Sequence, residues 1–493
     1  MDGDPREDTI DDDPSGEEGS SGPPGEGIAF IPALLIRKWR LILPFVLLLA
    51  LTFAPLPVET AIQHALAVFA CVAVLWILGG LSLAVTALLV PVLMVLYGLV
   101  PTAAAALAPF AQPVNFLMLG GLIIAQAFHK TGLDRRMAYK MVSLSKGDMK
   151  KTLLSLMLVS AGLSMWISNT ATVALLIPVV LGICSRAGEE RSRMCVVFLL
   201  AVAFASAMGG MATITGSPPN AIASGLLQQE IRWTFFDWMK IGVPISLGLL
   251  LFSWWVFPRI FPFERTSLDI SGVETDLQQM GPLTGLERRT LIIFFPTVFL
   301  WITGPNIAPL LGLPGAFMNS AIIALLGCSL LFAIGALSWK DAREVQWDIF
   351  LIIGGGLALG EGLTQSGAAQ WIADGVAGFA GDLGVFAFVF LIVAVTVLLT
   401  NLISNTATAA MFVPILIGIS VVMALDIRVL VLASALAASL AFITPIGTPP
   451  VTLVFSTDYI SRKELARGGI LLTIPCMIAV ALFCYLMVIL GLL

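Results

Sequence analysis

Apolar segments long enough to cross a lipid bilayer recur from residue 41 to the last residue of this 493-residue chain. A helix that spans the hydrocarbon core needs about 20 predominantly apolar residues. The composition agrees, because 58% of the residues are hydrophobic and 12% are charged, whereas soluble domains carry about 25% charged residues. The sequence therefore predicts an all-α polytopic membrane protein.

The beginning of the chain has a different composition. Residues 1–26 hold ten acidic residues and one Arg, together with many Gly, Pro and Ser. Such a segment cannot bury enough apolar surface to offset the entropy lost on ordering, so we predict a disordered acidic tail over residues 1–27. The segment also lacks the basic and apolar regions of a signal peptide.

The tetrapeptide Ser-Asn-Thr-Ala occurs twice, at residues 168–171 and 404–407, each time inside an apolar stretch and just before an apolar helical run. A second matched element follows each copy, Thr-Gly-Ser-Pro-Pro at 215–219 and Ile-Gly-Thr-Pro-Pro at 446–450. Polar breaks at corresponding positions of two similar halves are typical of transporter binding sites. Helix association alone is a weaker explanation for two such paired copies.

The two halves also resemble each other outside these motifs, since residues 115–138 are similar to residues 348–373. In both halves the order is a span, a short amphipathic linker, a Ser-Asn-Thr segment and a Pro-Pro span. This order predicts two inverted repeats with a shared site near the bilayer midplane. We expect the first half, with an initial helix, over 28–262, a cytoplasmic connector over 263–289, and the second repeat over 290–493.

The distribution of basic residues predicts the topology. If the apolar segments 152–185 and 384–424 are re-entrant hairpins, all but three of the 26 Lys and Arg residues lie in the tail or on the cytoplasmic side, as the positive-inside rule requires. The three exceptions are Arg232, Lys240 and Arg428. This reading gives eleven transmembrane helices, a cytoplasmic N-terminus and an external C-terminus. The spans are expected near 41–57, 60–80, 82–100, 113–129, 194–227, 239–262, 290–305, 315–337, 346–365, 428–457 and 468–491.

The motifs offer neutral ligands. Asn, Ser and Thr supply amide and hydroxyl groups, and the helix that follows each copy presents free N–H groups and a partial positive charge. Gly216 and Gly447 allow close approach of backbone carbonyls, and the prolines after them interrupt the helix. Oxygen ligands suit a hard cation such as Na⁺, and helix N-termini suit an anion. Each half thus offers a cation pocket and half of an anion pocket.

Other candidate residues carry weaker predictions. His129 ends a span and is expected to be interfacial, while Glu361 is an acid inside a span and therefore a functional hypothesis. The aromatic residues between 233 and 238 predict an interfacial belt. Two histidines without clustered acids argue against a membrane-embedded enzyme, and the paired hairpins suit occlusion better than a passive channel. The six cysteines lie in or beside apolar segments without a CxxC pair, which favours reduced packing residues.

From about residue 40 onward, the paired Ser-Asn-Thr motifs resemble those of the divalent anion/sodium symporter family, the sodium–dicarboxylate, sodium–citrate and sodium–sulfate transporters. The resemblance implies a homodimer in the cell (inner or plasma) membrane that works by an elevator mechanism. It implies sodium ions, a small divalent anion and the lipid bilayer as partners, and no nucleic acid. The favoured substrate is a C4 dicarboxylate such as succinate, malate or fumarate. Citrate, sulfate or another divalent anion, or sodium-independent exchange, remain alternatives.

The resemblance also implies roles for single residues. The first sodium site would use Ser164, Ser168, Asn169 and Gly216, and the second would use Thr400, Ile403, Asn405 and Gly447. The substrate would contact Asn169, Thr170, Ser217, Asn405, Thr406 and Thr448. One position departs from the family pattern, because Val451 follows the second Pro-Pro pair where Asn is usual, whereas the first pair keeps Asn220.

Overall fold

The computed structural model describes residues 26–185, 191–262, 266–380, 383–445 and 447–491. Within these ranges the chain is helical, without strands beyond an isolated bridge between Asp148 and Ser267. The prediction of an all-α protein is thus confirmed. The predicted tail lies outside the described residues except for residues 26–27, which begin the first helix.

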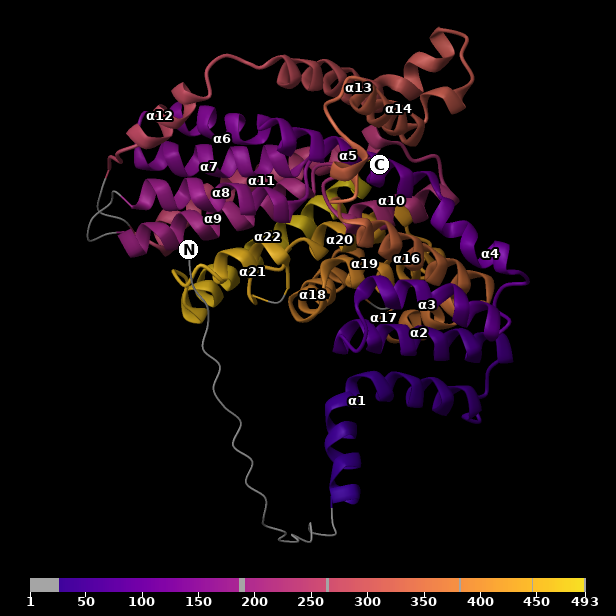
Figure 1. The fold of residues 1–493 in the computed structure, drawn as a ribbon. Coiled ribbons are helices and arrows are strands. Elements are labelled where there is room, and N and C mark those ends of the chain that lie inside the picture. Colours follow the sequence, from indigo (N-terminus) through magenta and orange to yellow (C-terminus); the bar gives the residue numbers. More distant parts are fainter. Residues whose placement is uncertain (1–25, 186–190, 263–265, 381–382, 446, 492–493) are drawn as a thin grey trace, which may run out of the picture.

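The helices of the first half follow the predicted order (Figure 1). They are α1 (Glu26–Phe53), α2 (Thr60–Leu78), α3 (Leu83–Leu96), α4 (Ala103–Leu107), α5 (Pro113–Thr131), α6 (Leu133–Ser143), α7 (Met149–Ser164), α8 (Asn169–Cys184), α9 (Arg191–Gly210), α10 (Pro218–Glu230) and α11 (Phe235–Ile260). The first Ser-Asn-Thr copy forms the turn between α7 and α8, a pair called hairpin 1 below. The first Pro-Pro pair begins α10.

The second half repeats this pattern after α12 (Ser271–Gln279), which lies in the predicted connector. Its helices are α13 (Gly285–Leu310), α14 (Ser320–Ala333), α15 (Trp339–Ala342), α16 (Trp347–Gln365), α17 (Ala368–Ala380), α18 (Val385–Leu402), α19 (Asn405–Val422), α20 (Ile427–Ala438), α21 (Pro449–Phe455) and α22 (Arg462–Ile489). The second Ser-Asn-Thr copy joins α18 and α19, called hairpin 2. The second Pro-Pro pair begins α21.

Eight of the described helices are long and apolar enough to cross a membrane, or nine if the bent pair Ala103–Ala111 and Pro113–Thr131 forms one span. Both arms of hairpin 2 pass this test, so length and composition alone do not separate a hairpin arm from a true span. The chain is therefore a multi-pass membrane protein. The count of eleven spans and the re-entrant nature of the hairpins stay predictions.

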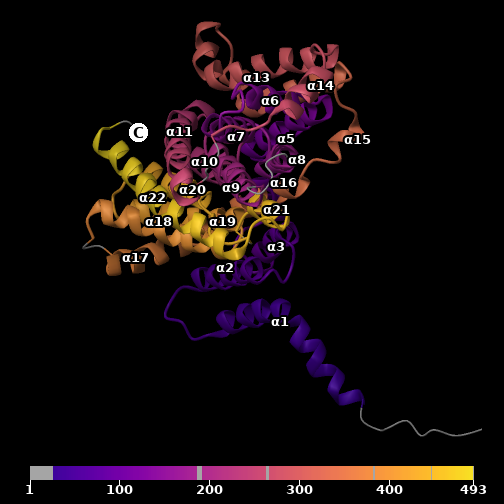
Figure 2. The same ribbon diagram turned by 90° about the vertical axis from the view of Figure 1, so that its left-hand side faces the viewer.

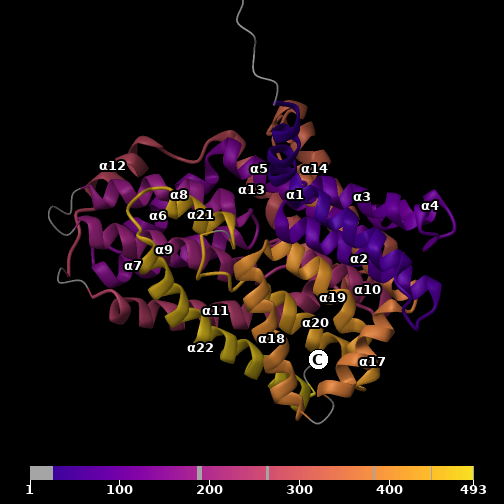
Figure 3. The same ribbon diagram turned by 90° about the horizontal axis from the view of Figure 1, so that it is seen from below.

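Each half contains a span that is interrupted by a loop before its Pro-Pro pair, α9–α10 in the first half and α20–α21 in the second. These two broken spans cross between the halves. The helix α10 packs against α19 and α20 of the second half, and α21 packs against α8 and α9 of the first half. Figure 3 shows α21 beside α8 and α9. The Pro-Pro motif of each half therefore lies next to the hairpin of the other half.

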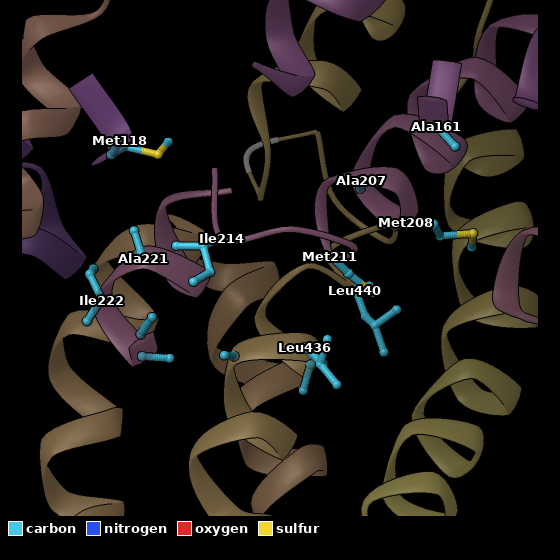
Figure 4. Close-up of a cluster of buried hydrophobic side chains, with 14 of the residues drawn as sticks. Met118, Ala161, Ala207, Met208, Met211, Ile214, Ala221, Ile222, Leu436 and Leu440 are labelled. Carbon is cyan, nitrogen blue, oxygen red and sulfur yellow. The ribbon is translucent and has the colours of Figure 1, made fainter. Parts of the chain in front are cut away.

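The core sits around these crossings. The helix α9 is almost wholly enclosed, because 94% of its residues between Arg193 and Gly210 are buried, and it packs between α7 and α8. A Cβ at Gly209 would meet the backbone of Ala161 at 2.3 Å, so this close packing of α9 on α7 needs glycine. Figure 4 shows part of the core, including Met211 and Leu440, which follow α9 and α20 and share one apolar cluster.

The remaining helices flank this centre. Figures 1 and 2 show α1, α2 and α3 at one end of the molecule and α13 and α14 at the other. The linker helix α6 is anchored to α13, because Arg136 Nε contacts Glu287 Oε1 at 2.7 Å. Arg136 also donates to the carbonyl oxygen of Gly281, 2.7 Å away, at the end of the connector. The first half and the connector are thus joined by a largely buried ion pair.

The predicted aromatic belt at residues 233–238 is wrong for three of its four members. Trp233, Phe235 and Trp238 are 7%, 1% and 1% exposed, and only Phe236 is exposed. Trp238 Nε1 donates to the carbonyl oxygen of Met211, 2.9 Å away, so this side chain supports the turn after α9 rather than a membrane interface.

Candidate functional site

Both Ser-Asn-Thr motifs and both Pro-Pro motifs line one cavity of about 160 Å³. The motif residues that face it are Ser168, Asn169, Thr170, Gly216, Ser217, Pro218, Pro219, Ser404, Asn405, Thr406, Thr448, Pro449 and Pro450. The crossing of the broken spans explains this convergence, since it brings the start of α10 to hairpin 2 and the start of α21 to hairpin 1. Every residue predicted to bind substrate lies on this cavity.

The tips of the two hairpins present helix N-termini to the cavity. Ser168 is the N-cap of α8, and its Oγ accepts a hydrogen bond from the N–H of Ala171, 3.2 Å away. Ser404 occupies the same position before α19, but its side chain makes no capping hydrogen bond. The first N–H groups of a helix have no partner within the helix. The tips can therefore offer backbone donors to an anion. More of these donors are free at α19, where the Ser404 side chain leaves the N–H groups of the first turn uncapped.

Oxygen atoms gather just behind the tip of hairpin 1. Ser164 Oγ donates to Asn169 Oδ1 and lies 3.4 Å from Ser206 Oγ, which donates to the carbonyl oxygen of Asn169, 3.0 Å away. Ser164 and Ser206 are fully buried. Gly216 follows closely, because a Cβ there would lie 2.5 Å from the carbonyl oxygen of Gly210. The predicted ligands of the first cation pocket thus lie at the end of α7, at the start of α8 and in the loop before α10. Ser206 of α9, which was not predicted, adds a hydroxyl beside them.

The corresponding oxygens of hairpin 2 also lie close together. Thr400 Oγ1 lies 2.7 Å from both Asn405 Oδ1 and the carbonyl oxygen of Ala438. A hydroxyl has one proton and can satisfy one of these acceptors fully. The second acceptor then faces another oxygen at short range, a repulsion that a cation would relieve. These hydroxyl, amide and carbonyl oxygens could together act as ligands of a hard monovalent cation.

Each hairpin is attached to the broken span of its own half at matching positions. Ser160 Oγ donates to the carbonyl oxygen of Val202, 2.7 Å away, and Thr396 Oγ1 contacts Ser434 Oγ at 3.3 Å. Ser160 and Thr396 stand four residues before Ser164 and Thr400, one helical turn away. The two halves therefore repeat both their sequence order and their hydrogen-bonding positions.

Two buried hydroxyls near the second pocket have no hydrogen-bond partner among the described residues. They are Thr448 Oγ1 and Ser439 Oγ, in residues that are 2% and 0% exposed. A buried polar atom without a partner costs about 1–3 kcal/mol. Thr448 lines the cavity, so a bound molecule is the natural partner for its hydroxyl.

The cavity also contains side chains that the motifs did not indicate. Gln346 and Asp348 line it from the start of α16, and Met118 of α5 and Leu83 of α3 contribute apolar surface. Asp348 is exposed and brings a negative charge close to the hairpin tips. It lies in the first turn of α16, at the beginning of the segment that repeats residues 115–138. Its position at the site follows from helix packing, and no local spacing signals it.

A second cavity of about 470 Å³ adjoins the first, because Ser168, Thr170 and Gln346 line both. Glu344 and His129 stand farther along its wall. The larger cavity thus lies beside hairpin 1 and next to the site, and it is called the access route below.

The helix α15 is tied to the end of α5 near this route. Lys130 Nζ contacts Asp341 Oδ2, and the hydrogen bond from this ammonium holds the pKa of the Asp341 carboxyl well below its usual range. Asp341 also caps α15 by accepting from the N–H of Ser338, 2.6 Å away.

The two isolated candidates stand apart from the site. His129 lines the access route, where its Nδ1 lies 3.0 Å from Asp134 Oδ2. Glu361 accepts a hydrogen bond from Gln365 Nε2, 2.8 Å away, and does not line the cavity between the hairpins. Among the described residues, no three His, Cys, Asp or Glu side chains gather in a way that could hold a metal ion.

A polytopic helical protein with two related halves, crossed broken spans and one cavity shared by their hairpins has the architecture of a membrane transporter. Comparison with known proteins agrees. The sodium:sulfate symporter transmembrane region matches residues 35–493, and the chain belongs to this family. The chain is accordingly a transporter and not an enzyme.

Several relatives are similar over most of their length. A protein of Haemophilus influenzae named an uncharacterized transporter is 36% identical, covering 87% of this chain and 93% of that protein. The sodium-dependent dicarboxylate transporter SdcS of Staphylococcus saprophyticus is 31% identical, covering 86% of this chain and 85% of its own.

Solved structures share the fold. The YdaH transporter of Alcanivorax borkumensis has a TM-score of 0.52 at 15% identity, covering 78% of this chain and 87% of its own. The MtrF protein of Neisseria gonorrhoeae, described as belonging to a class of antimetabolite efflux pumps, also gives 0.52, at 16% identity and with 77% and 82% coverage.

Proposed function

We propose that this protein is a sodium-coupled symporter of divalent anions, with C4 dicarboxylates such as succinate, malate or fumarate as its substrates. The observation that carries the proposal is the single cavity on which both Ser-Asn-Thr tips and both Pro-Pro motifs converge. The similarity to sodium-dependent dicarboxylate transporters supports it.

In this proposal the anion lies between the tips. Asn169, Thr170 and Ser217 bind it from one half, and Asn405, Thr406 and Thr448 bind it from the other. The N-termini of α8 and α19 contribute backbone donors and a partial positive charge. The unpartnered Thr448 hydroxyl supports a role in hydrogen bonding to a carboxylate.

Two sodium ions supply the remaining positive charge. The first uses Ser164, Ser168, Asn169 and Gly216, and the second uses Thr400, Ile403, Asn405 and Gly447. Asn169 and Asn405 belong to both the sodium and the substrate sets, so occupancy of a cation pocket fixes the amide that the anion needs. A dianion without such compensation is costly inside a membrane, and this dependence couples the two ligands.

The size of the cavity favours a small dianion. Pockets for drug-sized ligands measure about 300–1,000 Å³, and the space between the tips is about 160 Å³. A four-carbon dicarboxylate suits this space better than the larger citrate, and sulfate or another small divalent anion is the main alternative substrate.

Transport requires access from each side in turn. We propose that the hairpins are re-entrant, that the N-terminus is cytoplasmic, and that the site moves by an elevator mechanism within a homodimer. The access route beside hairpin 1 then opens to the cytoplasm, because Lys130 and the neighbouring basic residues lie on that side under the positive-inside rule.

Uptake of labelled succinate into proteoliposomes tests the proposal. We expect uptake driven by an inward sodium gradient and absent when choline replaces sodium. The melting temperature should rise with sodium and not with choline, because a ligand that binds the folded state stabilises it. Sodium-independent uptake with equal melting curves would favour an exchanger, and unlabelled sulfate that competes better than succinate would change the substrate.

A further inference from the structure

The loops inside the two broken spans are supported differently. The first loop covers residues 211–217, between α9 and α10, and the described part of the second covers residues 439–445 and 447–448, between α20 and α21. Asn220, which follows the first Pro-Pro pair, holds the first loop. Its Nδ2 donates to the carbonyl oxygens of Gly210 at 2.8 Å and Thr213 at 2.7 Å. Val451 occupies the equivalent position in the second half and can form no such bond.

Asn401 forms side-chain hydrogen bonds to the second loop, and it does so from α18 rather than from the helix that follows the loop. It lies in the last turn of α18, where its Nδ2 donates to the carbonyl oxygen of Leu440 at 3.3 Å. Its Oδ1 accepts from the N–H of Ile443 at 2.9 Å. The residue is 6% exposed. One buried amide therefore satisfies both a carbonyl and an N–H of the second loop.

The first half has no amide at this place. Met165 stands three residues before Ser168, as Asn401 stands three residues before Ser404. One backbone contact is shared, since Thr213 Oγ1 donates to the carbonyl oxygen of Met165 and Thr444 Oγ1 donates to that of Asn401. The side-chain anchor is the part that differs. The pair Met165 and Asn220 in one half is exchanged for Asn401 and Val451 in the other.

We propose that Asn401 is the positioning residue of the second cation pocket and takes over the task that Asn220 performs in the first half. The second loop carries Gly447, where a Cβ would lie 3.1 Å from the carbonyl oxygen of Thr400 and 3.5 Å from the Cα of Asn401. The carbonyl ligands of the second loop thus pack directly on the end of α18. This inference rests on the proposed function and adds to it a residue outside the ligand set.

The position of Asn401 on hairpin 2 has a mechanical consequence. Asn220 fixes its loop to the helix that follows it, so the first loop is held within its own broken span. Asn401 fixes the second loop to the hairpin that carries Thr400 and Asn405. The hydroxyl, amide and loop ligands of the second pocket are therefore held by one element. Without the amide, the carbonyl of Leu440 and the N–H of Ile443 in the second loop would lose this partner.

Substitutions that exchange the two arrangements test this inference. Asn401→Met installs the residue of the first half, and Val451→Asn restores the amide after the Pro-Pro pair. In proteoliposomes, Asn401→Met should raise the sodium concentration for half-maximal succinate uptake roughly tenfold, with a smaller change of the succinate KM at saturating sodium. The double variant Asn401→Met/Val451→Asn should return to within about threefold of wild type. Val451→Asn alone should stay near wild type.

Asn220→Val is the matched variant in the first half and should raise the sodium requirement by a similar factor. A melting curve in choline identifies variants that fail to fold, and Asn401→Ser is the smaller change to use if Asn401→Met is not recovered. Normal sodium dependence of folded Asn401→Met or Asn401→Ser would overturn the inference, as would a defect that Val451→Asn leaves unchanged. A wild-type protein without sodium dependence would instead overturn the proposed function.

Discussion

The two hairpin tips carry the same tetrapeptide but are supported in different ways. In hairpin 1, Trp166 joins an aromatic cluster with Phe235 of α11 and Phe294 and Trp301 of α13. Its ring centroid lies 6.3 Å from that of Trp301 and 5.6 Å from that of Phe294. The corresponding residue of hairpin 2 is Leu402, which is 62% exposed.

The comparison separates chemistry from support. The polar residues at the tips are repeated, and the anion proposed to lie between the two halves would require similar donors on both sides. The aromatic support is not repeated, because Leu402 stands at the position of Trp166 and is largely exposed, although α19 of hairpin 2 packs against α10 of the first half. Tip 1 is thus packed against α11 and α13 through Trp166.

The largest expected effect tests the shared chemistry. Asn169→Ala and Asn405→Ala should each reduce the affinity for succinate by about ten- to a hundredfold, since a hydrogen bond to a charged group contributes roughly 1.5–3 kcal/mol. Both should also weaken sodium binding, because each amide is proposed to serve a cation pocket. Initial uptake rates at varied succinate and sodium measure this. A normal rate for one of the two variants would mean that the site is not shared.

The next effect tests the difference in support. Trp166→Ala should destabilise the protein by about 2–3 kcal/mol, somewhat below the cost of truncating a fully buried Trp, and it should increase labelling of a cysteine placed at Ile167. Leu402→Ala is the matched change in hairpin 2 and should cost less than about 1 kcal/mol because the side chain is largely exposed. Equal losses of melting temperature would contradict the proposed asymmetry.

A third prediction concerns the unpartnered hydroxyl of Thr448. Thr448→Val removes a buried polar atom without a partner, so the ligand-free protein should gain about 1 kcal/mol of stability. Succinate binding should weaken at the same time, because the hydroxyl is proposed to donate to a carboxylate. Melting curves with and without succinate measure both changes. Stability that falls without succinate would show that the hydroxyl already has a partner.

The smallest expected effect concerns Asp348, the one carboxylate among the described residues on the wall of the site cavity. Its charge opposes a dianion, and Asp348→Asn should improve the apparent affinity for succinate by about two- to fivefold at low salt, in the range of exposed charge pairs. The gain should shrink at high ionic strength because screening weakens exposed charges. Gln346→Ala, on the same wall, is the control and should show no such salt dependence.

The sequence predicted the helical fold, the two hairpins and the convergence of the Ser-Asn-Thr motifs because these depend on apolar periodicity and on an exact repeat. It did not predict Asp348, whose place at the site is set by the packing of α16 against the centre of the molecule. The sequence also did not predict the contact between Trp166 and Phe235, since an aromatic residue in an apolar run can face lipid or protein. Packing between distant helices decides such cases, and the local pattern does not record it.

The same limit applies to Asn401. The loss of the amide at Val451 was visible in the sequence as a departure from the family pattern, and its replacement from another helix was not. A residue three positions before Ser404 reaches the second loop only because α18 and α20 pack side by side. Compensation of this kind appears only when both halves are compared as structures.

The crossing of the broken spans also determines when hairpin 1 can complete its packing during synthesis of the chain. The hairpin arm α8 packs on α21, which begins at Pro449 near the end of the chain. At synthesis rates of about 5–20 residues per second, α8 waits on the order of half a minute for this partner to be made. During that interval the polar tip of hairpin 1 needs water or a chaperone to cover its Ser and Asn side chains. Truncated chains that lack α21 should therefore be degraded even when every earlier helix has been inserted.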